Sequence, residues 1–261
     1  MKVLVTGAAG SIGRTLVRGL PDLGHEVRGL DLVDGPPGAC TLGWIVGDCL
    51  DPAVADEAVS GMDAVVHLAG NPDEASLPES LESHVHTTGR LLEAMLTHGV
   101  GRMAYASSNH AVGHTPYADL LTTGVRPRPD THYGVAKAAA EALLSLYADR
   151  RGISSVAMRI GSFHERPTSV RELSTWLSPG DAVRMADAAI RSPKPGFHLL
   201  YGISANTRAW WDLGPGRALG YDPQDDAETY ADDVRPSPGD ADENAYVGGP
   251  HVSQLQLPPA F

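Results

Sequence analysis

The stretch that decides the fold is Val3-Leu4-Val5-Thr6-Gly7-Ala8-Ala9-Gly10-Ser11-Ile12-Gly13, at the start of the chain. Its apolar run predicts a buried strand, and the apolar spacing after the glycines predicts a helix that stops at Pro21. Glycines at these positions remove side chains that would keep a pyrophosphate from the free amides at the helix start. Strand, glycine turn and helix in this order predict a dinucleotide-binding site.

Strands and helices alternate through the rest of the chain. Apolar runs predict strands at 26–30, 44–46, 64–68, 102–106, 155–160 and 197–203, and helical spacing predicts helices at 51–59, 78–98, 133–150 and 180–191. This pattern predicts an α/β fold: a Rossmann-type doubly wound parallel sheet of about seven strands, with a small C-terminal substrate lobe and an extended tail. Ligands are expected at the carboxyl edge of such a sheet.

We expect one domain over residues 1–261. Residues 1–160 form mainly the dinucleotide-binding core, and residues 161–235 form mainly substrate-side elements and the last strand. The Pro- and Gly-rich tail, residues 236–261, is expected either to drape on the body or to join a subunit contact.

The composition excludes several classes of protein. A net charge of -12 argues against nucleic acid and anionic membranes as partners. Cys40 and Cys49 have no paired or metal-like spacing, which suits a reducing compartment and predicts no metal site. The first apolar run is too short for a signal peptide or a membrane span. We therefore expect a cytoplasmic enzyme that binds any anionic ligand through local groups.

Acidic residues at strand ends identify the cofactor. Asp31 ends the second strand, where a carboxylate accepts from adenosine ribose hydroxyls and repels a 2′-phosphate, so we expect NAD rather than NADP. A solvated strand-end carboxylate is the alternative reading of Asp31, and a turn-forming residue is that of Asp48. The candidate cofactor residues are Gly7, Gly10, Ser11, Ile12, Gly13, Asp31, Asp48, Cys49, Leu68, Ala69, Gly70, Tyr133, Lys137 and Ile160.

Tyr133 and Lys137 are four residues apart, which puts both side chains on one face of the predicted helix. To ionise near neutrality, a phenol must lose roughly 2 to 3 pKa units, or about 3 to 4 kcal/mol. A cation at about 4.5 Å in an effective dielectric of about 20 supplies close to that amount. We therefore predict Tyr133 as a base, with Ser108 delivered beside it by strand 102–106.

These motifs together resemble the extended short-chain dehydrogenase/reductase superfamily, which includes the NAD-dependent epimerase/dehydratases, over nearly the whole chain. Within it, further stretches look like uronate dehydrogenases: Ala106-Ser107-Ser108-Asn109-His110, Arg128-Pro129-Asp130-Thr131-His132-Tyr133-Gly134-Val135-Ala136-Lys137, Arg159-Ile160-Gly161-Ser162, Arg171-Glu172-Leu173-Ser174-Thr175-Trp176, Ser204-Ala205-Asn206 and Trp210-Trp211-Asp212.

The resemblance implies NAD-dependent oxidation of a hexuronate, galacturonate or glucuronate, at its anomeric carbon to an aldarolactone. Tyr133 would take the C1 hydroxyl proton, Lys137 would lower the tyrosine pKa and bind the nicotinamide ribose, and Ser108 would hold the same hydroxyl. Arg171 would bind the substrate carboxylate, because a planar fork of donors suits that group. The remaining polar contacts would come from Ser162, Asn109 and His110. The resemblance also suggests a homo-oligomer.

The chain departs from the family at two places. His86 stands where the family usually has Asn, and the loop 71–76 is lengthened by about two residues. Asp73 and Glu74 in this loop are unusual beside a site for an anion. Two alternatives stay open: a sugar or sugar-nucleotide epimerase, dehydratase or reductase of the same superfamily, and a non-catalytic NAD-binding regulator, a class that typically loses the tyrosine or the lysine.

Some candidate residues also have a purely structural reading. Arg171 could be an ordinary surface residue in a loop, and His110 could simply finish a turn. Trp210 and Trp211 fit a buried core better than a platform for stacking a sugar.

Overall fold

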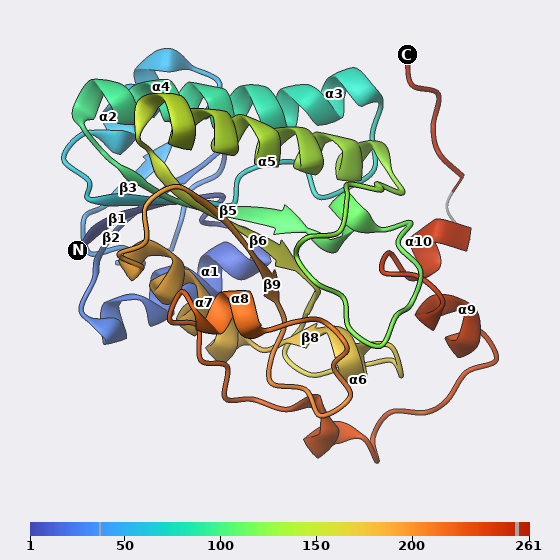
Figure 1. Ribbon diagram of the computed structural model, residues 1–261. Coiled ribbons are helices and arrows are strands. Elements are labelled where there is room, and N and C mark those ends of the chain that lie inside the picture. Colours follow the sequence, from blue (N-terminus) through green and yellow to red (C-terminus); the bar gives the residue numbers. More distant parts are fainter. Residues whose placement is uncertain (37, 254–255) are drawn as a thin grey trace.

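The computed structural model describes residues 1–36, 38–253 and 256–261 (Figure 1). Its centre is a parallel sheet in the order β3-β2-β1-β4-β5-β6-β9, which confirms the predicted Rossmann-type fold. The seven strands are β1 (Lys2–Thr6), β2 (Glu26–Asp31), β3 (Trp44–Val46), β4 (Ala64–His67), β5 (Arg102–Ser108), β6 (Ser154–Ile160) and β9 (Phe197–Gly202). All seven lie where the apolar runs predict them.

Helices cover both faces of the sheet (Figure 1). Successive side chains of β1 point to opposite faces: Val3 and Val5 join one apolar core, and Leu4 joins the other. The first core is closed by α1 (Ser11–Gly19) and α7 (Pro179–Arg191), and the second by α2 (Pro52–Val59), α4 (Thr87–His98) and α5 (His132–Arg151). Both faces are buried, as a parallel sheet requires.

The helix predicted over 78–98 contains a defect. It consists of α3 (Leu77–Leu81), a π-turn (Glu82–His86) and α4. A π-turn carries one extra residue and leaves backbone carbonyls without their usual helical partners. Thr88 Oγ1 donates to the His84 carbonyl at 2.5 Å, and Thr87 donates to the Ser83 carbonyl, so both carbonyls of the turn accept a side-chain hydrogen bond. The turn leaves the His84 side chain buried at the carboxyl edge of the sheet.

Smaller elements complete the fold. The elements β7 (Ser162–Phe163), α6 (Glu172–Thr175), β8 (Trp176–Leu177), α8 (Gly214–Arg217), α9 (Asp240–Asn244) and α10 (Pro250–Ser253) follow β6, and 3-10 turns lie at Pro21–Leu23, Asn109–Val112 and Ala227–Tyr230. Trp210 and Trp211 are buried in one cluster with Val247, so the core reading of this pair is confirmed. No helix among the described residues combines the length and the apolarity needed to cross a membrane.

Candidate active site

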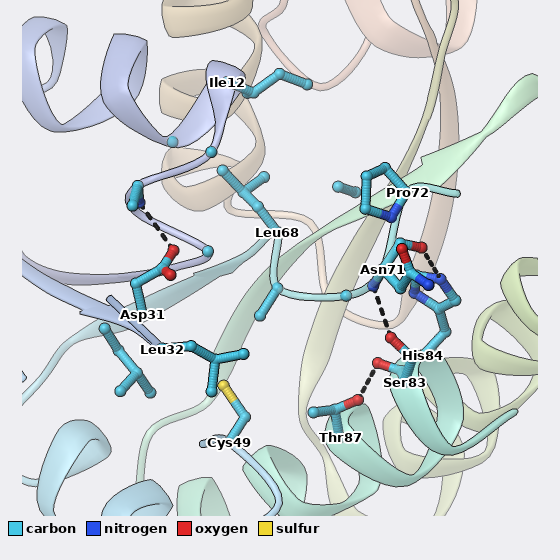
Figure 2. Close-up of a pocket in the computed structure, with 18 of the residues that line it drawn as sticks. Ile12, Asp31, Leu32, Cys49, Leu68, Asn71, Pro72, Ser83, His84 and Thr87 are labelled. Carbon is cyan, nitrogen blue, oxygen red and sulfur yellow. Dashed lines mark hydrogen bonds between the residues drawn. The ribbon is translucent and has the colours of Figure 1, made fainter. Parts of the chain in front are cut away.

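A cleft of about 950 Å³ opens at the carboxyl edge, where β2 and β4 flank β1 on opposite sides. The chain winds in opposite directions from this point, which is where doubly wound sheets bind ligands. Every candidate cofactor residue of the sequence analysis lines this cleft. Figure 2 shows Asp31 on one side and His84 on the other, with Leu68 between them.

The glycine loop leaves room for a pyrophosphate. Gly7 has φ +66°, and a Cβ on Gly13 would lie 2.1 Å from the Gly7 carbonyl oxygen. No side chain caps the start of α1, so its amides and dipole are available to an anion. Asp31 Oδ2 accepts from the Ala9 amide at 2.9 Å, which fixes its carboxylate inside the cleft. These residues fit a dinucleotide.

Asp48 both stabilises a turn and lines the cleft. Its Oδ1 accepts from the Leu50 amide at 2.8 Å, and the same residue lines the pocket beside Cys49. Both readings of Asp48 from the sequence are therefore compatible with its position.

Ser108, Tyr133 and Lys137 meet at the inner end of the cleft. Ser108 ends β5, and Tyr133 lies in the first turn of α5, which Thr131 caps by accepting from the Gly134 amide at 2.8 Å. Lys137 lies one turn further on. Its Nζ donates to the Ala106 carbonyl at 2.7 Å and lies 5.3 Å from the centroid of the Tyr133 ring.

The electrostatics of this pair differ from the Coulomb argument made from the sequence. Burial raises the pKa of Tyr133 to about 12, and a hydrogen bond with Ser108 opposes this only in part. Burial also lowers the pKa of Lys137 to about 7, against the attraction of Glu141. The attraction between the two groups favours both charges, whereas desolvation disfavours each of them. Burial of the two groups therefore opposes the ionisation that the attraction between them favours.

A buried ion pair lies behind the catalytic candidates, and sequence reasoning missed it. Arg159 is 2% exposed; its Nε donates to Glu141 Oε1 at 2.9 Å and its Nη2 to Oε2 at 2.7 Å. Ser107 Oγ donates to Glu141 Oε1 at 2.6 Å. The available signal was spacing, because Glu141 follows Lys137 by four residues on the same helix face.

The candidate substrate residues Asn109, His110, Ser162 and Arg171 lie outside the cleft lining. Ser162 Oγ pairs with Thr175 Oγ1 at 3.0 Å. Arg171 is buried, so its reading as an ordinary surface residue is wrong.

His110 is held by a residue that the sequence analysis left without a role. Its Nδ1 lies 3.0 Å from both carboxylate oxygens of Asp130, whose side chain is fully buried. His110 also lies near Tyr133, with ring centroids 6.0 Å apart. The histidine therefore does more than finish a turn.

The lengthened loop 71–76 reaches the start of α5. Glu74 accepts from the backbone amides of His132 at 2.7 Å and Tyr133 at 3.2 Å. A carboxylate is favourable at a helix N-terminus, which gives this acidic residue a structural purpose. Across the same space, the rings of His84 and Tyr133 are 5.0 Å apart, and burial holds the pKa of His84 far below its usual range.

No group of three His, Cys, Asp or Glu side chains in the described parts of the chain is arranged to hold a metal ion.

Residues 3–164 match the NAD dependent epimerase/dehydratase family.

Relatives match over nearly the full length. A uronate dehydrogenase from Pseudomonas syringae pv. tomato is 34% identical over 256 residues, covering 97% of this chain and 93% of that protein. An L-arabinose 1-dehydrogenase (NAD(P)(+)) from Haloferax volcanii is 33% identical over 264 residues, covering 88% and 99%. The crystal structure of uronate dehydrogenase from Agrobacterium tumefaciens superposes with a TM-score of 0.90 at 34% identity, covering 100% and 98%; a variant of that enzyme has been solved in complex with NAD.

Proposed function

The chain belongs to the NAD-dependent epimerase/dehydratase family, and we propose that it is a dehydrogenase that oxidises a hexuronate at its anomeric carbon to an aldarolactone, with NAD as hydride acceptor. The observation that carries the proposal is the meeting of Ser108, Tyr133 and Lys137 at the end of a cleft whose other end suits a dinucleotide. A non-catalytic regulator would have no need of this trio.

NAD would be held by the glycine loop, by Asp31 at the adenosine ribose and by Tyr133 and Lys137 at the nicotinamide end. When bound, it supplies the hydride acceptor and, in its oxidised form, a positive ring charge. A cation beside the phenol favours the ionised form of Tyr133, in the direction opposite to burial.

The chain's own residues would then act on the sugar hydroxyl. Ser108 would orient the C1 hydroxyl, and the ionised oxygen of Tyr133 would take its proton and become the neutral phenol. Lys137 holds its ammonium between the Ala106 carbonyl and the tyrosine ring. Arg171 provides the charge that an acid substrate needs in a protein of net charge -12.

A neutral aldose is the second candidate substrate. The Haloferax volcanii relative carries the name of an L-arabinose 1-dehydrogenase, and Glu74 places a carboxylate 3.2 Å from the Tyr133 amide. The hydride and proton chemistry at C1 would be the same. Only the groups that meet the far end of the sugar would differ.

The test compares the rate of NADH formation from galacturonate, glucuronate, galactose and L-arabinose. Turnover of the acids supports the proposal, and turnover of the neutral sugars alone refutes the assignment of a hexuronate as the substrate. Tyr133→Phe is expected to abolish turnover while NAD still binds, because the proton acceptor is lost.

Arg171→Ala is expected to raise the KM for the acid by about 10- to 100-fold, the cost of losing a charged hydrogen bond. Arg166→Ala is the matched control, because that arginine is exposed in the same loop. Equal KM values for the two variants would show that the Arg171 side chain does not bind the sugar acid.

We propose further that the enzyme acts in the cytoplasm as a homo-oligomer. One domain would combine the cofactor core (1–160), the substrate side (161–235) and the tail (236–261). Light scattering on the purified protein tests the oligomeric state.

A further inference from the structure

The segment Tyr246–His251, here called the C-terminal segment, lies against residues assigned above to the sugar. The Val247 carbonyl accepts from Asn109 Nδ2 at 2.9 Å and from Arg171 Nη2 at 2.5 Å. The ring of His251 lies 4.6 Å from that of His110. Three of the four candidates outside the cleft lining thus contact one short segment that is distant in sequence and lies at the carboxyl end of β5 (Figure 1).

Two glycines allow this close approach. A Cβ on Gly248 would lie 1.8 Å from Asp130 Oδ2. A Cβ on Gly249, which has φ +64°, would lie 2.3 Å from Arg171 Nε. A side chain at either position would therefore push the backbone away from a buried charged group.

The segment is anchored as well as close. The Val247 side chain is fully buried with Val112 and Trp211, and its amide donates to the Thr115 carbonyl at 3.0 Å. The Gly248 amide donates to the Gly113 carbonyl at 2.9 Å, so the Val247 carbonyl is held on both sides and keeps its direction toward the guanidinium.

We propose that the C-terminal segment is a specificity element, in which the Val247 carbonyl positions Arg171 so that its remaining donors face the carboxylate of the sugar acid. A guanidinium has five N–H donors in a rigid fork, and fixing one sets the directions of the others. The inference rests on the proposed function. It adds that the preference for an acid over a neutral aldose depends on residues 246–251.

The test uses Gly249→Ala, with Gly239→Ala as the control in the same tail, where a Cβ would meet Glu243 Oε1 at an ordinary 3.8 Å. In Gly249→Ala the KM for galacturonate is expected to rise about tenfold, as for a weakened charged hydrogen bond. The Kd for NAD, measured by quenching of protein fluorescence, and the KM for galactose are expected to stay within about twofold, because the cofactor cleft lies outside the segment. A general loss of structure would move all three values.

An unchanged galacturonate KM in Gly249→Ala overturns the inference, and a lowered KM does so too, because it would mean that the segment obstructs the site. If the wild-type protein oxidises no uronate, the proposed function fails and this inference fails with it. If the wild type oxidises uronates and the glycine variant matches it, only the inference fails.

A second measurement needs no variant. Amide hydrogen exchange of the wild-type protein with NADH is compared with and without galactarate, a product-like diacid. Slower exchange over 246–251 with galactarate is expected, because the sugar acid would tie Arg171 and the segment together. Exchange unaffected by the diacid while it binds, as measured by calorimetry, would overturn the proposal.

Discussion

Replacing Glu141 with methionine should destabilise the protein by about 3 to 5 kcal/mol, because it leaves a buried guanidinium without its partner. Arg159 is 2% exposed and donates twice to Glu141, and Ser107 loses its acceptor in the same change. For a chain of this length, the thermal midpoint should fall by roughly 10 °C. Urea unfolding followed by circular dichroism gives the free energy.

The double variant Glu141→Met with Arg159→Met is the control. It removes both charges from the same site, so it should be less destabilised than Glu141→Met alone. A single variant within about 1 kcal/mol of wild type would show that Arg159 can find water or another partner. A double variant as unstable as the sum of the two single variants would show that the pair is not coupled. Either result refutes the reasoning.

The folded-state pKa of Lys137, about 7, lies below its unfolded value of about 10.4, so the free energy of unfolding should rise with pH between these values. This rise should be absent from the unfolding free energy of Lys137→Met measured over the same pH range. A difference profile that is flat or falls over this range would contradict the burial of the amine. Asp31→Ala should weaken NAD binding by about tenfold and narrow the discrimination against NADP, measured by fluorescence titration, since it removes an acceptor and a negative charge. Gly13→Ala should lower the free energy of unfolding by about 1 to 3 kcal/mol and weaken NAD binding more than Asp31→Ala does, because the new Cβ would lie 2.1 Å from the Gly7 carbonyl oxygen. Unchanged NAD affinity in calorimetry would show that the loop adapts.

Most of the sheet could be predicted from the sequence because strands buried on both faces appear as short apolar runs between helical patterns. The cofactor end of the cleft could equally be predicted from the sequence, since the glycine spacing and Asp31 act through backbone geometry close to them in the chain. The short pair β7 and β8 carries no comparable signal, and neither does the π-turn at Glu82–His86.

The substrate side could be predicted only in part, because its contacts join distant segments. Nothing local indicates that the Val247 carbonyl reaches Arg171, or that Glu74 would reach the first turn of α5. The direction of the Tyr133 pKa shift in the protein alone was not predicted, because the depth of burial is a property of the fold and not of the spacing to Lys137.

The π-turn also makes this part of the chain tolerant of a change in length. Deleting one residue within Glu82–His86 would turn the bulge into regular α-helix and keep α3 nearly in phase with α4, because about five π-helical residues turn through the same angle as about four α-helical ones. The deletion would redirect the side chains within the turn, His84 among them, while leaving the sheet and the contact of Glu74 with α5 in place. A single deletion would therefore remodel only the wall of the cleft that carries His84, opposite Asp31 (Figure 2).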